Sequence, residues 1–446
     1  MGNPDGGTTG RARAATWLAV YLLLVLAPLA ILMVGAQPRP GGFWWDFALA
    51  LGYAATGMFG VQFALTARFK RATAPFGIDV IYYFHRFLAV GALALLLLHA
   101  GILLVRHPAA TGGWDPRSMP AHMLLAWVAL LAFAALVTSS LWRKRLGIGY
   151  DRWRRWHVLL AVGGLLAALL HVHGSGSYLA APVDRALWIA LGAFWLGLAV
   201  WVRLLRPAWL RRRPWQVVSV RPECPGTWTL SLAPRHGPVP AYQPGQFAWL
   251  TLRAGPFAMR EHPFSFSSTP TRAGTVSFTI KELGDFTRTI GSIAPGETAY
   301  VDGPYGSFGI DRQPEAAGRV FIAGGVGIAP VMSMLRALAD RGDTRPKWLF
   351  YGNRVRERSA FADEIEAMAP AIGLTVVHVL LEPPPGWQGE TGYVDSAVLA
   401  RHLPAEVAGL QCYVCGPNAM IRLAEQSLVA LGVPLRQVHS ELFDLA

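Results

Sequence analysis

The chain has 446 residues, of which 53% are hydrophobic and only 15% are charged, and its formal net charge is +13. This composition is too apolar for an ordinary soluble protein, and the length allows about two or three domains. The charge is uneven, because residues 1–206 carry a net +12 and residues 207–446 a net +1. The basic excess belongs to an apolar half, where it reflects membrane topology and gives no reason to expect a nucleic-acid partner.

Six apolar runs of about 20 residues each predict transmembrane helices. The first run is expected to remain as a membrane anchor, since no obvious cleavage signal accompanies it. The runs cover residues 14–36, 44–66, 80–105, 120–142, 156–178 and 184–206.

The basic residues that flank these runs predict the orientation. Sixteen fall on the side of the N-terminus and four on the opposite side. By the positive-inside rule, both termini are cytoplasmic in a multi-pass protein of the cell (inner) membrane. We divide this half into a cytosolic N-terminus at 1–13, a six-helix domain in the lipid bilayer at 14–206 and a linker at 207–214.

Two of the predicted spans carry histidines at a repeated spacing. His85 and His99 are 14 residues apart in the third span, and His157 and His171 are 14 residues apart in the fifth. Fourteen helical residues return to within about 40° of the same face and rise about 21 Å, which places one histidine near each leaflet. Both spans run in the same direction, so His85 matches His157 in depth (the inner pair) and His99 matches His171 (the outer pair). The spacing predicts two b-type haems, each with two histidine ligands to its iron.

Other polar residues near these histidines have less specific explanations. His173 is 16 residues from His157 and faces away from it by about 160°, so we expect it in a loop or behind the ligands. Arg86, Arg154 and Arg155 lie beside the inner pair. They can hold haem propionates or can simply be cytoplasmic charges, and the sequence leaves both explanations open.

The pattern changes at residue 215. Short alternating runs broken by Pro and Gly predict an antiparallel β-barrel over 215–314. From 315 to 446, strands alternate with helical segments, which predicts a doubly wound parallel α/β sheet. The pair Cys412 and Cys415 has the spacing of a redox or zinc motif, but no second pair completes a zinc site, so we interpret it as a buried strand that ends in a turn.

Four motifs of this half resemble those of the prokaryotic NADPH oxidase and ferric reductase-like transmembrane family. HPFSFSS at 262–268 and IKELGDFT at 280–287 are similar to its two flavin-binding elements. GGVGIAP at 324–330 and CGP at 415–417 are similar to its nicotinamide-binding elements. The family joins a six-helix, two-haem membrane domain to a ferredoxin–NADP reductase-like module, and the resemblance covers residues 44–443.

The resemblance implies the following site residues. The flavin is expected to contact the first two motifs through His262, Pro263, Phe264, Ser265, Lys281, Gly284 and Thr287. The dinucleotide is expected to contact the next two through Gly324, Gly325, Val326, Gly327, Pro330, Cys415, Gly416 and Pro417. Cys415 and Phe443 are the implied catalytic residues, with Phe443 stacked on the flavin. Here Asp444, Leu445 and Ala446 follow that aromatic, which departs from the family pattern.

Arg354 and Arg356 follow the next predicted strand, where the adenosine ribose is expected. No Asp or Glu stands there to bind a ribose 2′-hydroxyl, so we expect a 2′-phosphate and therefore NADPH, with NADH as the alternative donor. A solvated basic loop is the other explanation of these arginines.

These features predict a transmembrane NADPH oxidase. Electrons from cytosolic NADPH would pass through FAD and two b haems to oxygen on the far side and form superoxide. A ferric chelate is the alternative small-molecule acceptor. A third hypothesis is an electron-transfer subunit for an extracytoplasmic protein, although the sequence shows no obligatory protein partner.

Overall fold

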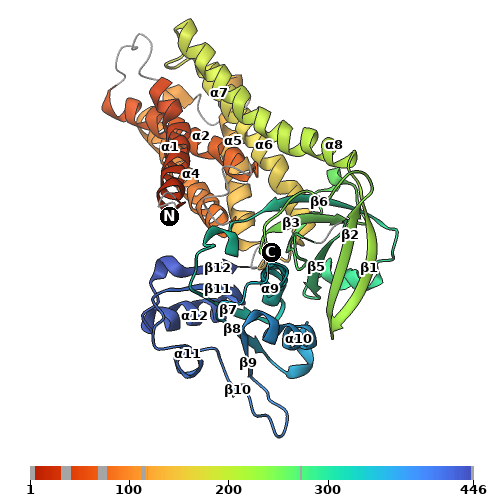
Figure 1. Ribbon diagram of the computed structural model, residues 1–446. Helices are drawn as coiled ribbons and strands as arrows, with labels where there is room; N and C mark the ends of the chain where they lie inside the picture. The colour runs from red at the N-terminus through yellow and green to blue at the C-terminus, as the bar shows by residue number, and fades with distance from the viewer. Residues whose placement is uncertain are drawn as a thin grey trace. The chain divides into compact units, whose positions relative to one another are not determined.

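The computed structural model describes residues 6–31, 42–68, 78–111, 117, 119–271 and 274–442, and the side chains of the first and third segments from residues 15 and 81. The chain divides into two compact units, Met1–Ala208 and Trp209–Ala446 (Figure 1).

Long helices make up the first unit. Its described helices are α1 (Gly6–Ile31), α2 (Phe43–Thr66), α4 (Ile78–Arg106), α5 (Ala121–Trp142), α6 (Tyr150–Ser175) and α7 (Pro182–Val200). A π-helical turn, Trp201–Leu205, continues α7 into α8 (Arg206–Arg211). Among the described residues, five helices from α2 onward are long and apolar enough to cross a membrane, and α1 contributes a shorter apolar stretch, Ala15–Ile31. The predicted helical membrane part is confirmed.

The fifth predicted span is shifted toward the N-terminus in the structure. It was expected at 156–178, but α6 begins at Tyr150 and ends at Ser175. Its first turns carry arginines, which are good helix formers, so hydropathy alone misses them. Gly176 in the left-handed conformation (φ 66°) ends the helix.

Small residues let the helices approach closely where the histidines lie. α5 packs along α6, and α2 packs along α4. A Cβ at Gly60 would lie 2.3 Å from the ring of Trp195, and one at Gly164 would lie 3.1 Å from the ring of Phe133. Glycine at such positions is typical of packed transmembrane helices.

The N-terminal part of the second unit is a six-stranded antiparallel sheet. Its strands are β1 (Trp215–Cys224), β2 (Thr227–Pro234), β3 (Phe247–Leu252), β4 (His262–Ser265), β5 (Val276–Lys281) and β6 (Thr298–Tyr305), in the order β4-β3-β6-β1-β2-β5. Alternating apolar residues such as Leu230, Leu232 and Phe278 fill its core. The predicted antiparallel β architecture of this part is confirmed, and the motif HPFS forms β4.

The C-terminal part is a parallel sheet with helices on both faces. Its strands are β7 (Gly318–Gly324), β8 (Lys347–Asn353), β9 (Leu374–Leu380), β10 (Glu390–Thr391), β11 (Leu410–Gly416) and β12 (Val438–Leu442), in the order β10-β9-β8-β7-β11-β12. The helices are α9 (Ile328–Asp340), α10 (Ala362–Ile372), α11 (Ser396–His402) and α12 (Asn418–Ala430). Two separate apolar clusters cover its two faces, as predicted for a doubly wound sheet.

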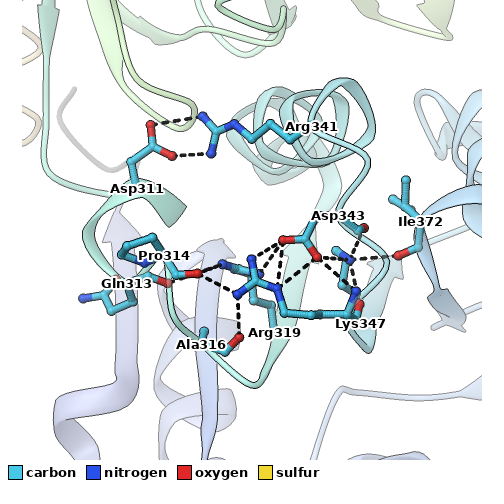
Figure 2. A network of polar contacts seen from close by, with 10 residues as sticks. Asp311, Gln313, Pro314, Ala316, Arg319, Arg341, Asp343, Lys347 and Ile372 are labelled. Carbon is cyan, nitrogen blue, oxygen red and sulfur yellow. Dashed lines mark hydrogen bonds and ion pairs between the residues drawn. The ribbon is translucent and has the colours of Figure 1, made fainter. Parts of the chain in front are cut away.

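A buried ionic network lies near the amino ends of β7 and β8 (Figure 2). It consists of Asp343 and three cations, Arg319, Arg345 and Lys347, and we call it the Asp343 network. Arg319 and Arg345 also donate to the carbonyl of Pro314, which lies between the barrel and β7. The network therefore fixes the connection between the two sheets.

Candidate functional site

The inner pair of histidines faces across the helices of the first unit. The ring centroids of His85 on α4 and His157 on α6 are 6.2 Å apart. An imidazole nitrogen binds a first-row metal ion such as zinc at about 2.0–2.1 Å. Two imidazoles on opposite sides of one metal ion therefore have centroids roughly 6–6.5 Å apart, once the distance from nitrogen to ring centre is added. At this separation both imidazoles would be able to hold one iron.

A cavity of about 360 Å³ adjoins this pair. Its walls are largely apolar, with Phe59 and Phe133 stacked at 3.7 Å, and the two histidines belong to its lining. Arginines also line it, namely Arg68, Arg86, Arg154 and Arg203. Apolar walls, paired imidazoles and cations suit a flat apolar group with anionic substituents, so these residues fit a haem with its propionates.

The structure separates the three arginines that the sequence grouped together. Arg86 and Arg154 line the cavity, and Arg154 is only 7% exposed. Arg155 is not among the lining residues, and its Nε donates to the Asp151 carbonyl at 3.4 Å. Arg155 therefore fits the second explanation, a charge that flanks the span and does not line the cavity.

Three of the four predicted ligands are held in one tautomer. His99 Nδ1 lies 2.7 Å from the carbonyl oxygen of Ala48, and His171 Nδ1 lies 2.8 Å from that of His122. A carbonyl only accepts hydrogen bonds, so each Nδ1 carries the proton and each Nε2 keeps its lone pair. This is the arrangement that second-shell acceptors impose on metal-binding histidines.

His157 is held in the same way by a hydroxyl. Ser140 Oγ donates its one hydrogen to the Leu136 carbonyl at 2.6 Å. It therefore accepts from His157 Nδ1, which lies 3.2 Å away. The sequence did not reveal these acceptors, because Ala48 and His122 are about fifty residues from the histidines that they support.

The outer pair is packed against α2 and α5. A Cβ at Gly52 would lie 2.9 Å from the His99 ring, so only glycine allows that approach. The ring of His122 lies 6.1 Å from that of His171. His173 is exposed, which agrees with its exclusion from the predicted ligands.

The flavin motif HPFS lies on β4, at the edge of the barrel sheet. The ring of His262 stacks on Phe286 with centroids 4.0 Å apart, and Phe264 lies 6.1 Å from the same ring. Pro263 pairs with Trp249 of β3. Ser265 Oγ is buried and has no hydrogen-bond partner among the described residues, so it is free to bond a ligand.

The second flavin motif forms a turn after β5. Thr287 Oγ1 accepts from the backbone N–H groups of Leu283 and Gly284 at 2.8 and 2.9 Å. The Thr287 hydroxyl therefore shapes this loop. Lys281 ends β5 and lines a cavity of this unit.

Glycines bring β7 and β11 together at their carboxyl ends. A Cβ at Gly327 would lie 2.2 Å from the Cys415 carbonyl oxygen, and one at Gly416 would lie 3.1 Å from Gly324 Cα. Gly325 has φ +53°, and α9 with Pro330 in its first turn follows. The strand order reverses between β7 and β11, and such switch points bind ligands in open α/β sheets.

A cavity of about 650 Å³ opens at this point. Its described lining includes Thr227, Lys281, Gly324, Gly325, Val326, Arg354, Arg358, Tyr393, Pro417 and Met420. Residues of the barrel and of the parallel sheet thus line one cavity.

The structure revises the predicted pair of arginines. Arg354 lines the cavity, but Arg356 lies outside its lining and forms an ion pair with Glu366 at 2.5 Å. Arg358, which the sequence analysis missed, lines the cavity instead. Arg356–Arg358 forms a 3₁₀ turn with about three residues per turn, so alternate positions no longer share a side.

An acidic residue near these cations was also missed. Arg354 Nη2 lies 2.7 Å from Glu382 Oε1. The sequence analysis found no carboxylate after β8, but Glu382 comes from the end of the neighbouring parallel strand β9. The sequence signal was Glu382 itself, the last residue of the run LLE at 380–382. Its position near Arg354 follows from the parallel pairing of β9 with β8.

The two cysteines of β11 are buried thiols. Burial raises the pKa of the Cys412 thiol to about 12. Burial and the nearby Glu441 carboxylate raise the pKa of the Cys415 thiol well above its ordinary value. Both thiols stay protonated at neutral pH, so Cys415 can serve as a neutral packing or donor group and not as a nucleophile. Glu441 is its register partner on β12, whereas Phe443 lies outside the described residues.

Comparisons with known proteins match both units. The family described as "Ferric reductase like transmembrane component" matches residues 51–169, and the "Oxidoreductase NAD-binding domain" matches residues 321–426. The ferredoxin–NADP reductase B of Sorangium cellulosum is 30% identical over 240 residues, which are 51% of this chain and 96% of that protein. The chain belongs to the ferric reductase-like transmembrane proteins fused to a ferredoxin–NADP reductase-like module.

The reductase module has further relatives. The propane 2-monooxygenase reductase component of Rhodococcus jostii is 31% identical over 237 residues, 51% of this chain and 62% of that protein. The chain thus spans less than two thirds of that relative. The solved ferredoxin reductase in carbazole 1,9a-dioxygenase is 26% identical, with a TM-score of 0.46 over 52% of this chain and 69% of that one.

Family membership gives the general activity of this chain. It is a multi-pass membrane protein and an NAD(P)H-dependent oxidoreductase that transfers electrons through FAD. Ferric reductase-like proteins generally carry haem.

Proposed function

We propose that this reductase passes electrons from cytosolic NADPH through FAD, the inner haem and the outer haem to oxygen on the opposite side of the membrane, and that superoxide is the product. The observation that carries the proposal is the 6.2 Å separation of the inner histidine rings beside an apolar, arginine-lined cavity. A nicotinamide donates two electrons at once as a hydride. Haem, when bound, supplies the one-electron chemistry by which these electrons are passed on singly.

The residues of the first unit bind the two haems and fix their orientation. His85 and His157 hold the inner haem, and His99 and His171 hold the outer haem. Arg86 and Arg154 pair with propionates of the inner haem, since charge-assisted hydrogen bonds suit carboxylates. The acceptors on Nδ1 of His99, His157 and His171 keep Nε2 of these three rings deprotonated and fix the ring orientation.

The residues of the second unit recognise the two dinucleotides. The buried hydroxyl of Ser265 bonds the flavin ring, and Lys281 pairs with a phosphate. Gly324, Gly325 and Gly327 let the nicotinamide dinucleotide approach the N-terminus of α9. FAD, when bound, supplies the hydride acceptor. The Cys415 thiol stays neutral, and the Cys415 carbonyl oxygen packs closely against Gly327.

The adenosine end of the nucleotide meets a mixed set of charges. Arg354 and Arg358 bind a 2′-phosphate, which favours NADPH. Glu382 lies against Arg354 and can accept a hydrogen bond from a 2′-hydroxyl, so NADH is also a substrate. Tyr393, which is 64% exposed and lines the cavity, gives the adenine a ring to stack on.

Local charge at the outer end favours oxygen over a ferric chelate. Arg106 lies over the Trp44 ring at 5.1 Å, and Arg185 donates to the Leu179 carbonyl at 3.4 Å, so both cations are engaged locally. Asp46, bonded to the Tyr178 hydroxyl at 2.6 Å, adds negative charge at the same end. An anionic chelate gains little attraction there, whereas oxygen needs only access to the haem edge.

The acceptor is tested in proteoliposomes that expose the reductase unit outside. NADPH added outside under air should give superoxide inside, measured as superoxide-dismutase-sensitive reduction of enclosed cytochrome c. Anaerobic reduction of an enclosed ferric chelate should be slower. Faster reduction of the chelate at matched concentrations would replace the oxidase with a metalloreductase. Reduction of neither acceptor, with reduced haems, would favour a protein acceptor.

A further inference from the structure

His85 is the one predicted ligand whose ring lacks a visible support. Its Nδ1 is buried and has no hydrogen-bond partner in the part of the chain that the structure describes. The other three rings each have an acceptor within 3.2 Å of Nδ1. Buried polar atoms are nearly always satisfied, so an unpaired Nδ1 at a ligand position points to a missing partner.

Gln62 on α2 offers the complementary atom. Its side chain is buried, with 7% of the residue exposed, and Nε2 donates to the backbone carbonyl of His85 at 3.2 Å. Its other heteroatom, Oε1, is also buried without a hydrogen-bond partner among the described residues. One planar amide is thus attached to the backbone of His85 and carries an unused acceptor, while His85 carries an unused donor.

We propose that Gln62 is the positioning residue of the inner haem ligand. Its Oε1 accepts the Nδ1 proton of His85 through one bridging water, since the structure shows no direct hydrogen bond between the two atoms, and so holds the ring in the tautomer whose Nε2 binds iron. The proposal rests on the proposed role of His85 as a haem ligand. Both residues line the same cavity, so the amide lies where a change in it acts on the haem.

This hydrogen bond has a consequence for the direction of electron flow. A hydrogen bond from Nδ1 raises the basicity of the imidazole, which stabilises the ferric state and lowers the reduction potential. Both outer ligands donate to backbone carbonyls, whereas His157 has only the Ser140 hydroxyl. Without Gln62, the weaker hydrogen bonding at the inner ligands would by itself give the inner haem the higher reduction potential. Electron transfer from the inner to the outer haem would then be energetically uphill. The Gln62 oxygen offsets that difference.

The test is a redox titration of both haems in the purified full-length protein, with electron paramagnetic resonance of the ferric state. Gln62→Leu keeps the approximate size and removes the acceptor, and Gln62→Glu keeps an acceptor oxygen. Thr138→Val is the matched control, because the Thr138 hydroxyl also bonds a carbonyl of its own helix, that of Ala134, but Thr138 is not among the residues that line the cavity. His85→Ala checks the ligand assignment.

Gln62→Leu should raise the midpoint potential of the inner haem and change its ferric signal, while the outer haem keeps its wild-type values. Gln62→Glu should keep the potential at or below that of wild type, and Thr138→Val should leave both potentials unchanged. If Gln62→Leu loses the inner haem, retention in Gln62→Glu supports the proposal and loss in both variants overturns it. Unchanged inner-haem potential and signal in Gln62→Leu also overturn it, even where His85→Ala removes the inner haem. Full haem content in His85→Ala would instead overturn the proposed function.

Discussion

Replacement of Asp343 by Asn should strongly destabilise the reductase unit, because one carboxylate compensates two buried cations, Lys347 and Arg319 (Figure 2). The side chains of Lys347 and Arg319 are 0% and 2% exposed, and their nitrogens lie 3.0 and 3.2 Å from the Asp343 oxygens. Removal of one partner of a buried ion pair costs about 3–5 kcal/mol. At about 2–4 °C per kcal/mol for a unit of this size, the melting temperature should fall by roughly 6–20 °C.

The pH dependence of the stability difference between wild type and Asp343→Asn provides a second test of this prediction. Burial by itself raises the pKa of Asp343, but the hydrogen bonds from Arg345 and Lys347 outweigh it, so the pKa is lowered overall. A carboxylate with a lowered folded-state pKa stabilises the fold above its unfolded pKa of about 3.9, and this contribution is lost as the pH falls further. The difference between wild type and Asp343→Asn should therefore be constant from pH 6 to 8 and shrink below about pH 4.

The assay is thermal unfolding of the detergent-solubilised full chain, followed by the release of flavin fluorescence. Asp311→Asn is the matched control, since its partner Arg341 is 42% exposed and such a pair contributes only about 0–1 kcal/mol. A melting temperature of Asp343→Asn within the range of the Asp311→Asn control would refute the reasoning.

Three further predictions concern the binding sites. Replacement of Arg354 and Arg358 by neutral residues should raise the KM for NADPH much more than the KM for NADH. Each lost contact is worth about 1.5–3 kcal/mol, which corresponds to roughly a 10- to 150-fold rise in the KM for NADPH. Equal changes for both nucleotides would show that neither arginine binds the 2′-phosphate. Glu382→Leu should raise the KM for NADH and lower that for NADPH, because it removes the acceptor for the 2′-hydroxyl and releases Arg354; steady-state kinetics with both nucleotides checks this. Gly52→Ala should displace His99 and remove only the outer haem, and a wild-type optical spectrum would count against that packing argument.

The histidine register was predictable from the sequence because helix periodicity is a property of the backbone. A spacing of 14 places two residues on one face whatever the neighbouring helices are. The pairing of His85 with His157 then followed from depth alone, and their measured ring separation agrees with it. The strand patterns likewise predicted both sheets, because alternation and glycine turns are local signals.

The supporting groups were not predictable in this way. The acceptors for His99 and His171 are backbone carbonyls of distant helices, which no side-chain pattern encodes. Arg358 replaced Arg356 because a single 3₁₀ turn rotates the chain, and the boundaries of such turns are weakly specified by sequence. Glu382 reaches the site only through the strand order.

The haem content of the purified protein and its histidine variants tests the central claim most directly. Pyridine-haemochrome analysis should give two haems per wild-type chain, both low-spin in the ferric state. His85→Ala and His157→Ala should each lose the inner haem, and His99→Ala and His171→Ala the outer one, whereas His173→Ala should retain both. One haem per wild-type chain, or two haems after any of the four ligand replacements, would contradict the account.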